Sequence, residues 1–439
     1  MNRTKIGLVG YSDKGNWVEN YTGTNKAGEI YTGYKANDIV HTVDGIFASM
    51  VDNNTTKPSD SSEYWRTWVD LRPLSLPATE YTLEQSSNPQ FTVTNDLAIR
   101  MYLARVGGYM MKVVNGQIYA AKLNANDWNY FEDGTPVDDA SKYETMVNFP
   151  KCYFKAHDKT MRFGGFYPIE GGHSFDSPEW IGAYKMYVDS DGVGHSRPNV
   201  APSHSRTIEG FWNCAQKLGS EFGLANYGFH CLANTLFQAS YGNLDCQSVI
   251  GEGFNHTNWE ACRDVPMGKC ISLGDGSGKI LYNNATLGNQ YSVKLFGFED
   301  LWGKLWEFRP GIYFYMDGST RYAVVYSGNR VSFSVDGRKF VCLDSANGNY
   351  VTKMQLGEYW DMIAQAVNGS ASSYYCDGYW ASTSGELLFV GGRADNGSLC
   401  GLSYAGSGNG RSCSWAGLGA RLAFYGQPVL VSGSELVAM

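Results

Sequence analysis

The order of apolar and polar positions along the chain predicts mostly short strands joined by turns. Between residues 28 and 52 apolar and polar side chains alternate, which is the period of a strand with one buried face. The dipeptide Asp44-Gly45 interrupts this alternation and predicts a hairpin turn. Residues 91–123 are β-like as well, and Asn115-Gly116 within them is a second hairpin signal.

Two segments follow the helical period instead. Residues 207–219 open with Thr207, a good helix N-cap, and stop at a glycine. Residues 225–242 also stop at a glycine, and their apolar side chains share one helix face: Phe229, Leu232, Leu236 and Phe237. Strands, then two helices, then many more strands predict an α+β fold rather than alternating βαβ units.

Chain length and local composition predict more than one domain. At 439 residues the chain exceeds the size at which a single core stops growing, which is about 250–300 residues. Residues 71–90 contain three prolines and little periodicity, so we expect a boundary there. The predicted parts are a small β-rich module at 1–72, a connecting segment at 73–100 and a large domain at 101–439.

Composition and charge then exclude several classes of partner. Apolar residues make up 43% of the chain and charged residues 18%, so we expect a folded protein; the net charge of -8 comes with no basic patch. Neither nucleic acid nor an anionic membrane surface is therefore an expected partner. The N-terminus lacks the apolar core of a secretory signal, and no apolar run is long enough to span a bilayer. We expect cytosolic synthesis and no membrane insertion.

The cysteines and histidines carry no signature of a metal site or a disulfide framework. The ten cysteines include no CxxC pair, and the seven histidines form no HxxxH motif, so we expect free, buried thiols and neither metal nor cofactor. The run "DSDG" at residues 189–192 has calcium-type ligands but lacks the rest of an EF-hand loop. The tip of a hairpin is the preferred interpretation.

A glycine-rich segment near the C-terminus is the strongest functional signal. Residues 374–415 hold nine Gly, seven Ser, four Tyr and two Trp, with only five charged residues. Tyr and Trp give contact area at low entropic cost, while Ser, Gly and Asn adapt, so this mixture is typical of binding loops. Strand-like residues 387–390 and 421–425 flank its second half, which predicts a loop surface on a rigid scaffold.

Three motifs, taken in order, resemble a known fold. "GFEDLWGKLWEF" (297–308), "GELLFVGGRADNGSLCGL" (385–402) and "GLGARLAFY" (417–425) look like the C-type-lectin-like fold of formylglycine-generating enzymes and of the variable proteins of diversity-generating retroelements. The resemblance spans roughly residues 100 to 430. Read without it, the paired Trp302 and Trp306 are expected in the core.

The resemblance assigns roles within the glycine-rich segment. It implies that Arg421 is structural, that glycines such as Gly391 and Gly392 are framework, and that the positions between them are variable. This chain departs from the family pattern at Ala394, where Trp is usual. The predicted ligand-contacting residues are Tyr374, Tyr375, Asp377, Tyr379, Trp380, Arg393, Asp395, Ser398, Leu399, Tyr404, Ser407, Asn409, Arg411, Ser412 and Trp415.

The N-terminal module carries a second resemblance. "YKANDIVHTVDGIFAS" (34–49) followed by "NNTTKPSDSSEYW" (53–65) is similar to the small carbohydrate-binding modules of chitinases and phage tail fibres. Aromatic rings can stack on sugars, and the candidates are Trp17, Phe47, Trp65 and Trp68. A role in the module's own small core is the alternative, and we favour it for three of the four.

These features together favour a binding protein over an enzyme. Enzymes of the resembled fold use two nearby cysteines to hold copper; here Cys400 and Cys413 lack the expected C-x4-C spacing. The resemblance implies a receptor-binding protein at the tip of a phage tail fibre, made in the host cytoplasm and part of the virion. Its implied partners are a host surface glycan or protein, other fibre proteins and two further copies in a homotrimer. The alternatives are an oxidase-fold enzyme and a bacterial surface adhesin.

Overall fold

The computed structural model divides the chain into two compact units, residues 1–77 and 78–439. It describes the larger unit apart from residues 85, 329 and 330. Of the smaller unit it describes residues 12–16, 22–24, 30–34, 38–41, 45–49, 54–55, 58 and 65–70.

The described part of the smaller unit is all β. A four-stranded sheet has the order β1-β4-β5-β6, and β2 and β3 form a separate antiparallel ribbon. β4 and β5 are antiparallel, which confirms the hairpin predicted around Asp44-Gly45. The candidate Trp17 and the side chains of Phe47, Trp65 and Trp68 lie outside the described residues. The strands are β1 Ser12–Asn16, β2 Thr22–Thr24, β3 Ile30–Thr32, β4 Asp38–His41, β5 Gly45–Ser49 and β6 Trp65–Asp70.

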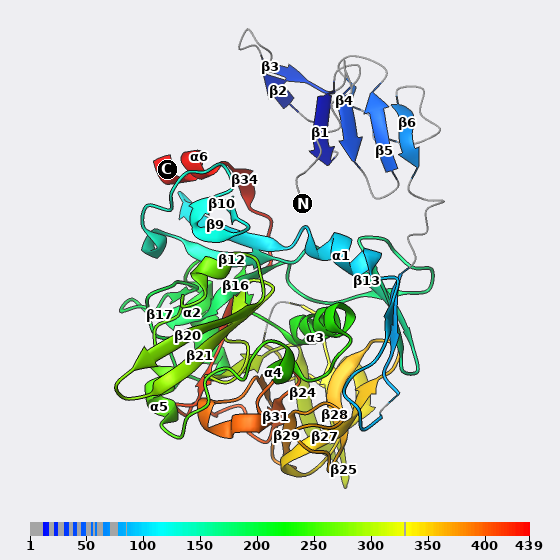
Figure 1. The fold of residues 1–439 in the computed structure, drawn as a ribbon, viewed down its shortest axis with the longest axis vertical. Helices are drawn as coiled ribbons and strands as arrows, with labels where there is room; N and C mark the ends of the chain where they lie inside the picture. Colours follow the sequence, from blue (N-terminus) through cyan, green and yellow to red (C-terminus); the bar gives the residue numbers. More distant parts are fainter. Residues whose placement is uncertain are drawn as a thin grey trace. The chain divides into compact units, whose positions relative to one another are not determined.

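The largest sheet of the second unit runs through its upper half in Figure 1, in the order β11-β10-β9-β12-β16-β33-β19. β9 and β10 form the hairpin predicted at Asn115-Gly116, and β34 adds to β10 in parallel. The bounds are β9 Gly107–Val114, β10 Gln117–Asn124, β11 Asp127–Phe131, β12 Glu144–Asn148, β16 Trp180–Lys185, β19 Phe222–Leu224, β33 Arg421–Phe424 and β34 Val429–Val431.

A seven-stranded sheet in the order β28-β27-β29-β31-β30-β23-β32 forms the other main layer. It contains the glycine-rich C-terminal segment. Its strands are β23 Trp306–Arg309, β27 Ala346–Leu356, β28 Asp361–Val367, β29 Gly378–Ala381, β30 Leu388–Val390, β31 Ala405–Ser407 and β32 Leu418–Gly419.

Smaller sheets complete the unit. They have the orders β15-β13-β14-β7-β8, β24-β25-β26 and β20-β21-β22, and β17 pairs with β18 in a hairpin at the predicted "DSDG" tip. Their strands are β7 Thr79–Thr82, β8 Val93–Thr94, β13 Tyr153–His157, β14 Thr160–Gly165, β15 His173–Ser174, β17 Tyr187–Val188, β18 Gly194–His195, β20 Gly278–Asn284, β21 Gly288–Leu295, β22 Phe298–Glu299, β24 Ile312–Asp317, β25 Thr320–Val325 and β26 Arg338–Val341.

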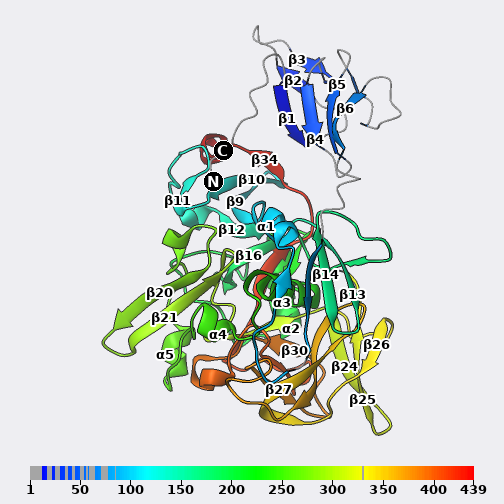
Figure 2. The same cartoon turned by 45° about the vertical axis from the view of Figure 1, so that its right-hand side comes forward.

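The two predicted helices are present. α2 (Ile208–Gln216) begins where the Thr207 side chain accepts the N–H of Gly210, and α3 (Tyr227–Tyr241) ends at Gly242 in the left-handed conformation. α3 is buried along most of its length between the two main layers (Figure 2). The other helices are short: α1 Leu97–Leu103, α4 Cys246–Val249, α5 Trp259–Arg263, α6 Gly433–Ala438 and the 3-10 turns η1 Ala140–Lys142, η2 Ile271–Leu273 and η3 Ala394–Leu399. With its many antiparallel strands, the unit is an α+β fold.

The predicted connecting segment at 73–100 is corrected by the structure. Residues 78–100 belong to the larger unit, because β7 pairs with β14 and α1 packs its Ile99 into the core. The alternation of apolar and polar residues in β7 covers only four residues, which is too short to predict a strand in a segment with three prolines. The boundary therefore falls at Pro77.

All ten cysteines are free thiols, and nine of them are buried, as predicted. Trp302 and Trp306 are buried in the core, also as predicted.

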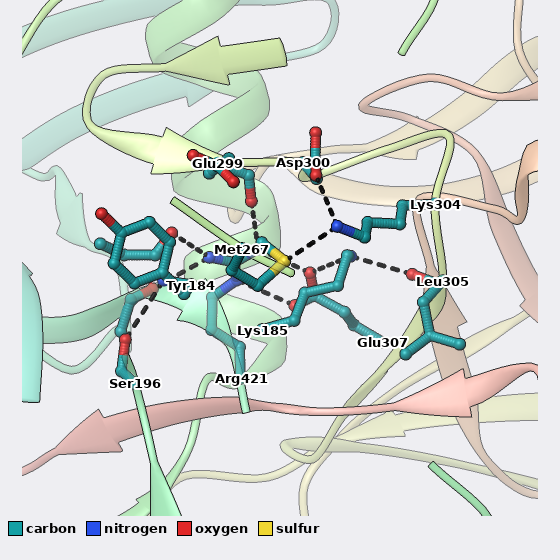
Figure 3. A network of polar contacts seen from close by, with 12 residues as sticks. Tyr184, Lys185, Ser196, Met267, Glu299, Asp300, Lys304, Leu305, Glu307 and Arg421 are labelled. Atoms are coloured by element: carbon teal, nitrogen blue, oxygen red, sulfur yellow. Dashed lines mark hydrogen bonds and ion pairs between the residues drawn. The ribbon is translucent and has the colours of Figure 1, made fainter. Parts of the chain in front are cut away.

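A cluster of buried charges joins the two main layers (Figure 3). The Glu307 carboxylate of β23 accepts hydrogen bonds from Lys185 of β16 at 2.6 Å and from Arg421 of β33 at 2.8 and 3.0 Å. Arg309 donates to the same carboxylate at 2.9 Å. Burial alone would raise the pKa of Glu307, but the charges of Arg421, Lys185 and Arg309 hold it well below its usual range. Burial lowers the pKa of Lys185 to about 8.

Arg421 has the structural role that was predicted for it. Besides Glu307, its guanidinium donates to the carbonyl oxygens of Gly182, Ala183 and Glu299 at 2.7–3.0 Å. Its side chain is fully buried.

Replacing Arg421 with Met should therefore lower the free energy of unfolding by about 3–5 kcal/mol, because Glu307 would lose a buried partner. Urea unfolding followed by tryptophan fluorescence measures this. The matched control is Arg100→Met, which breaks the exposed pair with Asp96 and should cost less than about 1 kcal/mol. Equal losses in the two variants would contradict the importance of the buried cluster.

His195 gives the fold a dependence on pH. Its buried ring has nitrogens 2.7 Å from Glu144 and 3.1 Å from Asp189. Burial lowers the pKa of His195, but hydrogen bonds to these two carboxylates outweigh that effect and leave the pKa above its usual value of 6.5.

Protonated His195 should thus stabilise the fold fully below about pH 6.5, and this contribution should disappear as the pH rises through the raised folded pKa. We expect the difference in unfolding free energy between the native chain and His195→Gln to shrink with rising pH. A difference that stays constant from about pH 5 to pH 9 would refute this.

Candidate functional site

The strand β23 pairs with both strands that flank residues 391–417, the last part of the glycine-rich segment, which we call the excursion. β30 pairs with it in antiparallel register, Glu307 opposite Val390, and β32 pairs with it in parallel, Glu307 opposite Gly419. Residues 391–417 therefore leave and rejoin the sheet at the same strand. The buried charges around Glu307 fix that strand to the rest of the unit.

The middle of this excursion is core, which corrects the expectation of a loop throughout. β31 inserts between β29 and β30, so residues 400–407 are buried. Two predicted contact residues, Tyr404 and Ser407, are thereby interior. Gly406 makes this insertion possible, since a Cβ there would lie 2.3 Å from the Phe389 ring.

Three more predicted contact residues are buried: Tyr375, Asp377 and Tyr379. The Tyr379 hydroxyl lies 2.9 Å from the hydroxyl of Ser407. The Asp377 carboxylate accepts the N–H of Ser403 at 2.8 Å, and burial raises its pKa well above the usual range. These side chains hold the segment onto the domain, and the prediction that they face a ligand does not fit their burial.

The other ten predicted residues are at least partly exposed, but they do not form one patch. The Arg411 guanidinium donates two hydrogen bonds to Oε1 of Glu386, at 2.7 and 3.1 Å. The Ser398 hydroxyl lies 2.7 Å from that of Tyr350. Tyr374 lines a separate cavity of about 490 Å³ beside β7 and β8.

Four of the predicted residues meet around one cavity of about 530 Å³, which we call the tryptophan groove. They are Trp380, Arg393, Asn409 and Trp415. Sequence reasoning missed its other lining residues, which come from β23, β27, β29, β30, η3 and the loops next to these strands: Trp306, Ser345, Ala346, Asn347, Ala381, Ser382, Phe389, Asn396 and Gly408.

The missed residues carry no local signal. Asn347 reaches the groove because β27 pairs with β29 and places it opposite Trp380. The two positions are far apart in the sequence, and only the folded sheet brings them together. Trp306 was expected in the core, and it is core on one side and groove lining on the other.

Aromatic side chains line the groove with their polar atoms already satisfied. The indole N–H of Trp380 donates to the Tyr404 hydroxyl at 2.6 Å. Tyr404 in turn packs on Trp306, with ring centroids 4.4 Å apart. The buried Tyr404 thus supports two indoles from below without contacting the cavity itself.

Arg393, another lining residue, is held by two tryptophans and by Asp395. Its guanidinium lies 4.3 Å from the ring centroid of Trp259 and 4.9 Å from that of Trp415. It also makes a bidentate pair with Asp395, with both distances 2.7 Å. The positive charge is neutralised and the two tryptophans are fixed in place.

Nothing in the described residues points to a metal or redox centre. No group of three His, Cys, Asp or Glu side chains is placed to bind a metal among them. The Cys400 thiol donates to the carbonyl oxygen of Arg393 at 3.1 Å, and burial raises its pKa. None of the helices in the described part of the chain is long and apolar enough to cross a membrane.

No protein-family model matches the sequence, and no curated protein matches it. Among solved structures, the chain is similar to the Major Tropism Determinant U1 variant, at 13% identity and a TM-score of 0.28, over 92% of this chain and 86% of that one. The P3c variant is 14% identical with a TM-score of 0.29, over 92% of this chain and 86% of that one. The M1 variant is 14% identical with a TM-score of 0.27, over 92% of this chain and 83% of that one.

The division of the segment into core and surface makes a prediction. Tyr404→Ala should destabilise the domain by about 3–5 kcal/mol, because a large buried ring is removed, whereas Asn409→Ala should change the stability by less than about 0.5 kcal/mol. Urea denaturation of both variants is the measurement. A neutral Tyr404→Ala would mean that residues 400–407 are not core.

Proposed function

We propose that the chain is a receptor-binding protein that attaches a phage particle to its host through the tryptophan groove. The observation that carries this proposal is the groove itself. It combines concave aromatic walls with uncharged polar side chains, and its volume lies in the range of about 300–1,000 Å³ typical of ligand sites.

The rigidity of the groove supports the same proposal. Six of its thirteen lining residues lie on β23, β27, β29 and β30, and both Trp306 and Trp380 are fixed by contacts with Tyr404. A site already formed before the ligand arrives loses little entropy on binding. Several such heads on one particle would turn weak single contacts into lasting attachment.

The remaining assignments of the proposal rest on the sequence motifs. They are a C-type-lectin-like arrangement of the large domain, a homotrimer that joins other fibre proteins, and a place at the tip of the tail fibre in the virion. Residues 1–72 would form a module that either binds carbohydrate or acts as a spacer. A bacterial surface adhesin would use the same groove.

The groove is better suited to binding than to oxidation. A copper site of the kind used by formylglycine-generating enzymes needs ionised thiols. Here the Cys400 thiol is a hydrogen-bond donor with a raised pKa, and Cys413 also has a raised pKa through burial. Both features favour the neutral thiol.

Adsorption to cells tests the proposal. The purified full chain, fluorescently labelled, is mixed with a panel of bacterial cells, and binding is compared between the native protein and Trp380→Ala. We expect binding to at least one strain that falls at least about tenfold in the variant, since a stacking ring is lost.

The control is Tyr130→Ala, which removes an exposed ring from β11 in the other layer and should bind normally. Thermal unfolding establishes that both variants are folded. If folded Trp380→Ala binds cells as well as the native chain does, the groove is not the attachment site.

A further inference from the structure

We propose that the ligand of the tryptophan groove is an uncharged saccharide. This inference rests on the function proposed above and narrows it to one chemical class. The first argument is charge. Of the thirteen residues that line the groove, only Arg393 carries a charge, and its bidentate pair with Asp395 leaves no free cation for an acidic ligand.

The second argument is the hydrogen-bonding capacity of the rim. The side-chain amides of Asn347 and Asn409 have no hydrogen-bond partner in the described part of the chain, and both face the groove. An amide both donates and accepts, as does a sugar hydroxyl. The NH₂ group of Asn396 also has no hydrogen-bond partner among the described residues, while its side-chain oxygen accepts the N–H of Arg393.

The third argument is the combination of these amides with indole surfaces. The N–H of Trp380 is used internally, so that the ring offers the groove its apolar surface. The C–H face of a pyranose packs on such a ring, while its hydroxyls reach the amides at the edge. Trp380 and Trp415 are partly exposed and provide two such rings, and the buried Trp306 forms part of the wall behind them.

The surroundings of the groove argue against a protein ligand. Protein interfaces have a hydrophobic centre of large exposed side chains. Among the described residues, none of the exposed large apolar side chains belongs to 374–415 or to 345–347. The partly exposed tryptophans of the segment, Trp380 and Trp415, both line the concavity, where a sugar ring can reach them.

An oligosaccharide array tests the inference with the full-length protein. The probes are immobilised neutral oligosaccharides and their sialylated or sulfated counterparts. We expect the native chain to bind at least one neutral probe, also in about 1 M NaCl, which screens charge interactions. Trp380→Ala and Asn347→Ala should each bind that probe several-fold to tenfold more weakly, and Tyr130→Ala should bind it normally.

Asp395→Asn sharpens the test, because it frees the Arg393 charge while keeping the shape of the side chain. It should gain binding to acidic probes that the native chain ignores. Binding of the native chain to acidic probes alone, or to no oligosaccharide at all, would overturn the inference. If cell adsorption still depends on Trp380 in that case, the receptor-binding function stands and only the saccharide is wrong.

Discussion

The pairing of Glu307 with Lys185, Arg309 and Arg421 is the interaction on which the rest of this structure depends. Four ionised groups in a dry interior are costly unless each is matched, and here every one donates to or accepts from another at 2.6–3.0 Å. The cluster links β16 and β33 of one layer to β23 of the other. Together with the burial of Trp306 and Phe308 in the hydrophobic core, it fixes the position of β23.

β23 in turn fixes parts of the tryptophan groove. Its first residue, Trp306, lines the cavity, and its two neighbours, β30 and β32, are the ends of the excursion 391–417. The buried part of the excursion, residues 400–407, then braces the exposed part from within through Tyr404. A binding surface made of glycine, serine and asparagine is held in one shape because its supports are core residues.

Sequence reasoning found the features that depend on local pattern. The N-cap of 207–219, the final glycine of 225–242 and the turn at Asn115-Gly116 each have a physical cause within a few residues. The structural role of Arg421 came from the family resemblance, because its partners lie far away in the sequence. It failed where long-range pairing decides. Tyr379 and Tyr404 are of a residue type common in binding loops, yet both are buried because β31 inserts between β29 and β30. Asn347 looks ordinary and reaches the groove only through β27.

Hydrogen exchange on the full chain gives the most direct test that β23 controls both ends of the excursion. In the native protein, amides of 388–390, 400–407 and 418–424 should be protected, and those of 408–416 should exchange faster, because they lie on the surface. In Glu307→Gln, protection should fall at 388–390 and at 418–424 together. A loss at one end alone, or no loss at either, would show that β23 does not hold the segment and would contradict the account.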